Sequence, residues 1–227
     1  MYAICALYKF TRLDDFEDIQ APLKSFLDAL SVKGTLLLAR EGINGTISGG
    51  KDSVEKVLDY LQTDDRFLEL EYKFSYSKKP PFKRLKVKLK KEIVTMGLSE
   101  VDPNHSVGTY IKPKDWNNLI NDPDVILIDT RNNYEYEIGS FKGAINPNTE
   151  TFREFPSFTK NSLKQYQDKK IAMFCTGGIR CEKSTAYLKS EGFENVFIFR
   201  VGFLNTWKRL KRKRVFGRVN ALYLMIE

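Results

Sequence analysis

One cysteine between a predicted strand and a predicted helix constrains the fold of this chain most. Cys175 follows the apolar run Ile171 to Phe174, and two glycines and Arg180 separate it from a helix that we expect to begin at about Cys181. Glycines allow the backbone to curl so that successive N–H groups point at one spot, which the positive end of the helix dipole also faces. We therefore expect a lowered pKa at Cys175, which favours the thiolate.

The loop that Cys175 opens has three interpretations. Arg180 adds a fixed positive charge, so the loop would also suit the charge of a persulfide on Cys175. The spacing Cys-x-x-x-x-Arg between a strand and a helix also fits a phosphatase loop, in which an oxyanion takes the place of the sulfur. The third interpretation is a buried, inert cysteine at the end of a core strand. The residues that would form the cradle are Thr176, Gly177, Gly178 and Ile179.

Composition bounds the class of protein. The 227 residues, of which 42% are hydrophobic and 29% charged, are enough for one large domain or two small ones. The net charge of +8 indicates either an anionic polymer as partner, above all nucleic acid, or a solvated basic surface. Every apolar run is shorter than the roughly 20 residues that span a bilayer, and the N-terminus does not resemble a signal peptide. We therefore expect a cytoplasmic protein with no membrane partner.

The cysteines and the histidine limit the chemistry. Cys5, Cys175 and Cys181 form no regular framework, which favours a reducing compartment over a disulfide scaffold. His105 is the only histidine and lies in a polar stretch, so we expect neither a metal site nor a Ser-His-Asp triad. No cofactor motif is evident in the sequence.

The N-terminal part has the order β-α-β-β-α-β, which is typical of a ferredoxin-like α+β domain, here over residues 1–95. Pro22 is unfavourable inside the first predicted helix, 16–30, and suggests that this helix begins there. Asn44-Gly45 predicts a turn at the centre of residues 40–46. Such a domain leaves one face of its sheet open.

Residues 78–91 are the most highly charged stretch of the chain. Apolar residues alternate here with cations, so a strand would have one apolar face and one cationic face. Cations two residues apart match a phosphate backbone, whereas the alternative is an edge strand whose lysines prevent aggregation. The candidate nucleic-acid contacts are Lys83, Arg84, Lys86 and Lys88.

The second half predicts alternating strands and helices. Turn signals predict a linker through Tyr110, and we assign 96–120 to the linker and the entry to a second domain at 121–202. The alternation is typical of an α/β fold with a doubly wound parallel sheet. In such sheets the ligand site lies beyond the carboxyl ends of the strands, where Asp129 and Cys175 stand.

These residues resemble a known signature. The first signature of rhodanese domains is similar to Ile128–Arg131, Tyr134–Tyr136, Gly139 and Gly143-Ala144, and their active-site loop is similar to Cys175–Arg180. This pairing disfavours the phosphatase interpretation. Rhodaneses usually carry a histidine after the first of these glycines, where this chain has Ser140.

The resemblance extends over residues 3–199. A small domain with GTLLLAREGINGTISG, then PFKRLKVKLKKEIVTMG, then a rhodanese domain with CTGGIRCEKSTAYLKS, is similar to the bacterial tRNA uridine hydroxylases that contain a rhodanese domain. The resemblance implies an oxidoreductase that converts the wobble uridine of tRNA to 5-hydroxyuridine, with molecular oxygen as co-substrate. It implies the anticodon arm of tRNA as partner and names no sulfur or electron donor.

The resemblance also assigns roles to single residues. Cys175 matches the family's active cysteine, which is described as carrying a persulfide intermediate by analogy with rhodaneses. Arg180 and the backbone of 176–179 match its cradle. Cys181 either resolves or accepts sulfur from Cys175, or simply faces the helix interior. Asp129 and Arg131 either brace the loop or form a structural ion pair, and we favour the ion pair.

Two other functions remain open. A rhodanese-type sulfurtransferase acting through a Cys175 persulfide would not need to bind a polymer, so the cationic strand disfavours it. A non-catalytic tRNA-binding module would need no reactive cysteine, so the intact loop disfavours it.

After Phe199 the resemblance ends. The family continues with a Gly-Gly turn and a cysteine-containing segment, whereas this chain has Val201-Gly202 and a cationic run at 208–214, which predicts a nucleic-acid tail. Alternatively, the atypical tail 203–227 is a frameshifted version of the family's C-terminus. One choice of codons for 216–227, with two bases dropped, encodes a family-like tail.

Overall fold

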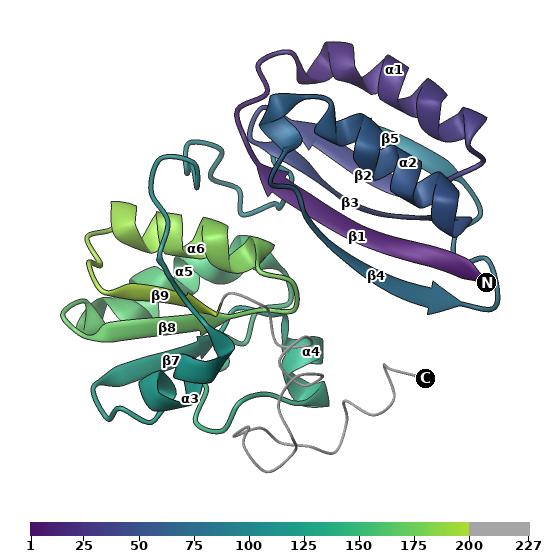
Figure 1. The fold of residues 1–227 in the computed structure, drawn as a ribbon. Coiled ribbons are helices and arrows are strands. Elements are labelled where there is room, and N and C mark those ends of the chain that lie inside the picture. Colours follow the sequence, from purple (N-terminus) through teal and green to yellow (C-terminus); the bar gives the residue numbers. More distant parts are fainter. Residues whose placement is uncertain (200–227) are drawn as a thin grey trace. The chain divides into compact units, whose positions relative to one another are not determined.

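Residues 1–199 are described by the structure, a computed structural model, and they divide into two units between Val94 and Thr95 (Figure 1). The predicted basic tail, 203–227, lies outside the described residues. None of the helices within residues 1–199 is long and apolar enough to cross a membrane.

The first unit is a sheet covered on one face by two helices (Figure 1). Its strand order is β4-β1-β3-β2-β5; the first four strands pair antiparallel and β5 pairs parallel to β2. This order confirms the ferredoxin-like α+β fold. The elements are β1 (Tyr2–Phe10), α1 (Phe16–Ala29), β2 (Lys33–Ala39), β3 (Gly42–Gly49), α2 (Lys51–Gln62), a 3-10 turn (Asp65–Phe67), β4 (Glu71–Ser77) and β5 (Leu85–Leu89).

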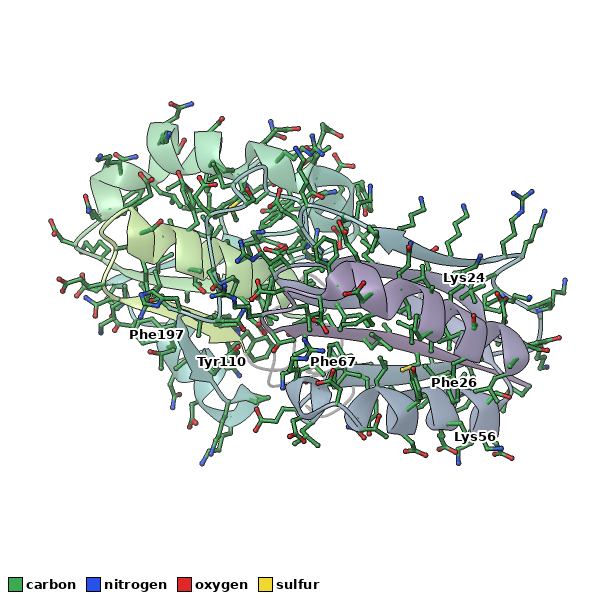
Figure 2. All side chains as sticks on the ribbon, turned by 90° about the horizontal axis from the view of Figure 1, so that it is seen from above. Lys24, Phe26, Lys56, Phe67, Tyr110 and Phe197 are labelled. Atoms are coloured by element: carbon green, nitrogen blue, oxygen red, sulfur yellow. The ribbon has the colours of Figure 1, made fainter. Side chains whose placement is uncertain are left out.

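Alternation along the strands decides which face the helices cover. Ala3, Cys5 and Leu7 of β1 are buried against the helices, while the intervening residues point to the other face. Leu23 and Leu27 of α1 enter the same core. Figure 2 shows the outer surface of the helix layer, where Lys24 projects from α1 and Lys56 from α2.

The predicted turn at Asn44-Gly45 is wrong, because both residues lie inside β3. Ala39 pairs with Gly42, so Arg40 and Glu41 form the hairpin loop instead. Gly45 is needed for close approach rather than for turning, since a Cβ there would collide with the carbonyl oxygen of β2 residue Thr35. The Asn44 amide donates to the carbonyl oxygen of Ile93 at 2.8 Å and ties the segment after β5 to the sheet.

The predicted helix start at Pro22 is also wrong, because α1 begins at Phe16 and Pro22 lies inside it. A proline in a helix interior removes one backbone hydrogen bond. Pro22 is exposed on the solvent side of α1, where water can reach the backbone, whereas Leu23 and Leu27 anchor the opposite side in the core. Burial of this apolar side holds the helix together across the proline.

The second unit is a parallel sheet in the order β6-β9-β8-β7. Its strands are β6 (Thr109–Ile111), β7 (Val125–Asp129), β8 (Lys170–Phe174) and β9 (Val196–Phe199). Its helices are α3 (Pro113–Ile120), α4 (Asn133–Ile138), α5 (Phe155–Phe158) and α6 (Ile179–Ser190). Short helical turns occupy Phe152–Glu154, Thr159–Leu163 and Lys164–Tyr166.

Alternate residues of β8 contact helices on opposite faces of this sheet. Ala172 and Phe174 lie in a cluster with Trp116 of α3. On the other face of the sheet, the Ser184 hydroxyl of α6 donates to the sulfur of Met173. The doubly wound α/β fold is therefore confirmed, and β8 is buried on both sides as its continuous apolar run predicts.

The predicted linker through Tyr110 is wrong at its C-terminal end, because β6 adds to the sheet beside β9. Tyr110 pairs with Ile198, and both Thr109 and Tyr110 are exposed. A strand of three residues with exposed side chains leaves no apolar run in the sequence. Only the pairing with β9 makes it a strand.

Candidate active site

The loop between β8 and α6 curls around the sulfur of Cys175. Gly178 has φ 108°, in the left-handed region that favours glycine, and its N–H donates to Cys175 Sγ at 3.0 Å. A Cβ at Gly177 would meet open space, so Gly177 is not required by packing. Of the two glycines in the predicted cradle, Gly178 is therefore the one that shapes it.

The electrostatics of the loop favour a thiolate at Cys175, which is 1% exposed. Burial alone would raise the pKa of Cys175. The S–H of Cys181, the charge of Arg180 and the backbone N–H groups of Cys181 and Gly178 outweigh burial and lower the pKa to about 5. The chain thus holds a negatively charged sulfur in a nearly dry site.

Cys181, the third residue of α6, lies against Cys175. Both its thiol and its backbone N–H are hydrogen-bonded to the Cys175 sulfur. Its sulfur also lies 3.3 Å from Thr130 Oγ1, whose hydroxyl donates to the carbonyl oxygen of Phe174. Burial, and then the neighbouring Cys175 thiolate, raise the pKa of Cys181 well above its ordinary value.

Arg180 is held by a glutamate that the sequence analysis did not single out as a site residue. Arg180 Nη1 and Nη2 donate to the two carboxylate oxygens of Glu135 at 2.6 Å and 2.9 Å. The Thr176 hydroxyl donates to the same carboxylate at 2.6 Å. Glu135 stands in the first turn of α4, so it fastens both ends of the cysteine loop to a neighbouring helix.

Burial would raise the pKa of Glu135, but the hydrogen bonds and charge of Arg180, with the Thr176 hydroxyl and the N–H of Asn132, hold it at about 2. One sequence signal points to this residue. Glu135 stands three residues after Asn132, the spacing of a helix N-terminal capping pair, and it accepts from the Asn132 N–H at 3.2 Å.

Asp129 and Arg131 form a buried ion pair at the end of β7. Arg131 Nη2 and Nε donate to the Asp129 carboxylate at 2.6 Å and 2.8 Å. Ser140 donates to the same carboxylate at 2.7 Å. The guanidinium also lies 5.8 Å from the ring centre of Phe174, the residue before Cys175. This geometry supports the favoured interpretation of a structural pair, located next to the start of the loop.

The cationic strand is β5, at the edge of the first sheet. Val87 is buried in the core beneath α1, while Lys86 and Lys88 are exposed. In register, Lys86 stands beside Thr35 and Lys88 beside Leu37, so both lysines share the face that no helix covers. Lys83 and Arg84, just before the strand, are exposed as well.

Among residues 1–199, no group of three or more His, Cys, Asp or Glu side chains is placed to hold a metal ion. The hydrogen bonds above make the candidate active site the cysteine loop with its partners from α4, α6 and the end of β7.

The thiolate assignment predicts the titration of the folded protein. The ultraviolet absorbance of the thiolate is expected to rise with a midpoint near pH 5 in the wild type, against an ordinary value of 9.0. The step should be absent in Cys175→Ser and present in Cys5→Ser, since burial raises the pKa of Cys5 to about 12. A midpoint near the ordinary cysteine value would contradict the proposed cradle.

Two family models match the chain in succession. The UPF0176 acylphosphatase-like domain matches residues 2–93, and the rhodanese-like domain matches residues 112–209. The first model falls on the unit that carries the cationic strand β5, and the second falls on the unit that carries the cysteine loop.

Solved structures similar to the chain include rhodanese-like proteins. A rhodanese-like domain from Anabaena sp. is 20% identical, with 48% of this chain and 77% of that chain covered, at a TM-score of 0.40. An uncharacterized protein from Saccharomyces cerevisiae is 22% identical (46% and 92% covered, TM-score 0.38). A rhodanese-related protein from Thermoplasma volcanium is 22% identical (44% and 92% covered, TM-score 0.36).

The order of the two matched domains is the one that the sequence resemblance implies. With a UPF0176 acylphosphatase-like domain followed by a rhodanese-like domain, the chain has the domain architecture of the family that its sequence resembles.

Proposed function

We propose that the protein hydroxylates the wobble uridine of tRNA at C5, with Cys175 as the catalytic residue. The observation that carries the proposal is the thiolate of Cys175, held by Gly178, Cys181 and Arg180 in a chain that also has a UPF0176 domain. A thiolate is the nucleophilic form of cysteine. Arg180 and the loop backbone position it.

The overall reaction sets what else is needed. A C5–H bond of uridine is replaced by a C5–OH bond with one atom of molecular oxygen, and the second atom leaves as water. This balance takes two electrons and two protons from a reductant. We propose a thiol as that reductant, because the redox-capable groups in the described part of the site are the two thiols Cys175 and Cys181.

The helix-free face of β5 supports tRNA as the substrate. Lys86 and Lys88 stand on one side of an edge strand, and Lys83 and Arg84 extend the charge at one end. A row of exposed cations neutralises phosphates and releases counterions. A small-molecule sulfur donor would not need such a row.

Removing two of these cations should weaken tRNA binding in a salt-dependent way. For Lys86→Ala/Lys88→Ala, the slope of log affinity against log salt is expected to fall by about 1.5 in magnitude, because two phosphate contacts are lost. Lys24→Ala/Lys56→Ala is the matched control, since it removes the same charge from the helix-covered face (Figure 2). Equal slopes for the two double variants, measured by titration at several salt concentrations, would argue against contact through β5.

The Cys175 loop also favours a second candidate, a sulfurtransferase. The Cys175 thiolate would attack the sulfane sulfur of a donor such as thiosulfate, so that the donor's S–S bond breaks, sulfite leaves and a Cys175 persulfide forms. An acceptor thiol would then take the outer sulfur. This activity needs the loop alone and no tRNA.

Modified nucleosides separate the two candidates. Digests of tRNA from cells that lack the gene, with and without the gene restored, are analysed for 5-hydroxyuridine derivatives by mass spectrometry. We expect the modification to return with the gene. If it never returns while purified protein moves sulfur from thiosulfate to cyanide, the sulfurtransferase is the correct function.

A further inference from the structure

The two cysteines of the rhodanese-like unit lie in direct contact. Cys181 is 0% exposed, and its thiol and backbone N–H both meet the sulfur of Cys175. The contact is to Sγ itself, the atom that becomes the inner sulfur of a persulfide. Its chemistry therefore differs from that of an acceptor that reaches the outer sulfur.

We propose that Cys181 is a resolving cysteine, which attacks Sγ of a Cys175 persulfide, forms a Cys175–Cys181 disulfide and releases the outer sulfur as hydrosulfide. The inference rests on the persulfide chemistry of the second candidate function.

The step balances without any further reactant. The S–S bond of the Cys175 persulfide breaks and the bond between the two Sγ atoms forms. The outer sulfur leaves with the electron pair of the broken bond and takes the proton of the Cys181 thiol, so Cys–S–S⁻ and Cys–SH become a disulfide and HS⁻. Attack at the inner sulfur makes the outer sulfur the leaving group. The disulfide returns to two thiols when a small thiol reduces it.

Thr130 positions Cys181 for this attack. Its Oγ1 donates to the Phe174 carbonyl at 3.0 Å and contacts the sulfur of Cys181 at 3.3 Å. Thr130 follows β7 and Cys181 lies in the first turn of α6, so two elements of the unit fix this geometry. A buried hydroxyl aimed at the thiol is not needed by a cysteine that merely fills the helix interior.

Electrostatics make the step conditional on sulfur loading. Burial raises the pKa of Cys181, and the neighbouring Cys175 thiolate raises it further. Cys181 therefore stays a protonated thiol as long as Cys175 is a thiolate. Once Cys175 carries sulfur, the negative charge moves to the outer atom, and Sγ becomes an electrophile. Cys181 is therefore unreactive until its substrate, the persulfide, is present.

The test uses the full chain and no tRNA, so its outcome is independent of hydroxylation. Reduced protein is treated with thiosulfate or with inorganic polysulfide, desalted, and followed for free sulfide and by peptide mass spectrometry. In the wild type and in the control Cys5→Ser, whose replaced thiol is buried in the other unit, we expect sulfide in equal amount to the sulfur loaded and a disulfide between the peptides of Cys175 and Cys181.

Cys181→Ser and Cys181→Ala are expected to retain the persulfide on Cys175 and to release sulfide only at the background rate until an external thiol is added. Retention of the added sulfur shows that the loop is intact in these variants. The disulfide in the wild type is measured without any variant. A wild-type protein that keeps its persulfide, or that never acquires one from either donor, would overturn the proposal, as would unchanged sulfide release from both Cys181 variants.

Discussion

Replacing Cys175 by serine is expected to reduce 5-hydroxyuridine in tRNA to the background of cells that lack the gene, a loss of at least about 10³-fold. A serine hydroxyl fits the site but stays protonated, because its pKa lies far above that of a thiol. The variant thus keeps the fold and loses the anion that Arg180 and the loop N–H groups hold at Cys175. Mass spectrometry of digested tRNA from the complemented strain measures the effect.

The control is Cys5→Ser, which makes the same atomic change at another buried cysteine. Cys5 lies in the core of the first unit, and burial raises its pKa to about 12, so it is held as a neutral thiol. Full modification with Cys5→Ser and none with Cys175→Ser assigns the effect to the thiolate. Normal modification with Cys175→Ser would end the proposal that Cys175 is catalytic.

The change Glu135→Gln is expected to lower the free energy of unfolding by about 3 kcal/mol, because it leaves the buried guanidinium of Arg180 without its hydrogen-bonded carboxylate. The two side chains are only 13% and 15% exposed, so water replaces the lost partner poorly. The same change releases the Thr176 hydroxyl and should loosen the cysteine loop. Urea denaturation gives the stability, and the thiolate absorbance of Cys175 reports the state of the loop.

Glu137→Gln is the matched control, since Glu137 is an exposed residue of the same helix, bonded to Asn133. We expect its stability to stay within about 0.5 kcal/mol of the wild type. Equal losses in both variants would mean that the ion pair of Glu135 with Arg180 does not hold the loop.

The contribution of Glu135 also has a defined dependence on pH. Its pKa is lowered from 4.5 to about 2 in the folded protein, so the unfolded state binds the proton more readily. The stabilisation is therefore complete above pH 4.5 and is lost as the pH falls through about 2. The stability difference between the wild type and Glu135→Gln should shrink over that range. A constant difference down to pH 2 would show that folding does not lower the pKa of Glu135.

Local patterns in the sequence determined most of the fold. The apolar run before Cys175 and the glycines after it predict the strand, loop and helix that the structure contains. The alternation of cations and apolar residues places Lys86 and Lys88 opposite Val87. These predictions are correct because strand and helix periodicity depends on residues within a few positions of one another.

Local patterns failed where a neighbouring strand sets the conformation. Asn44-Gly45 has the composition of a turn, but both residues lie inside β3. The glycine is needed there because the backbone of β2 passes too close for a Cβ. The three residues of β6 carry no apolar signal and become a strand through β9, more than 80 positions later. Sheet pairing at that separation leaves little trace in either segment alone.

The candidate site shows the same division. Sequence alone identified Cys175 and Arg180, because they stand only five positions apart. Tertiary structure decided that Glu135, 45 positions from Arg180, is its ion-pair partner, and that Thr130 meets Cys181 across 51 positions. The register of β7 against β8 brings the segments that carry these residues together. The ion pair of Glu135 with Arg180 has a low exposure, so its charges interact strongly. The sequence supplied the reactive groups, and the packing of the sheet set the charges and hydrogen bonds around them.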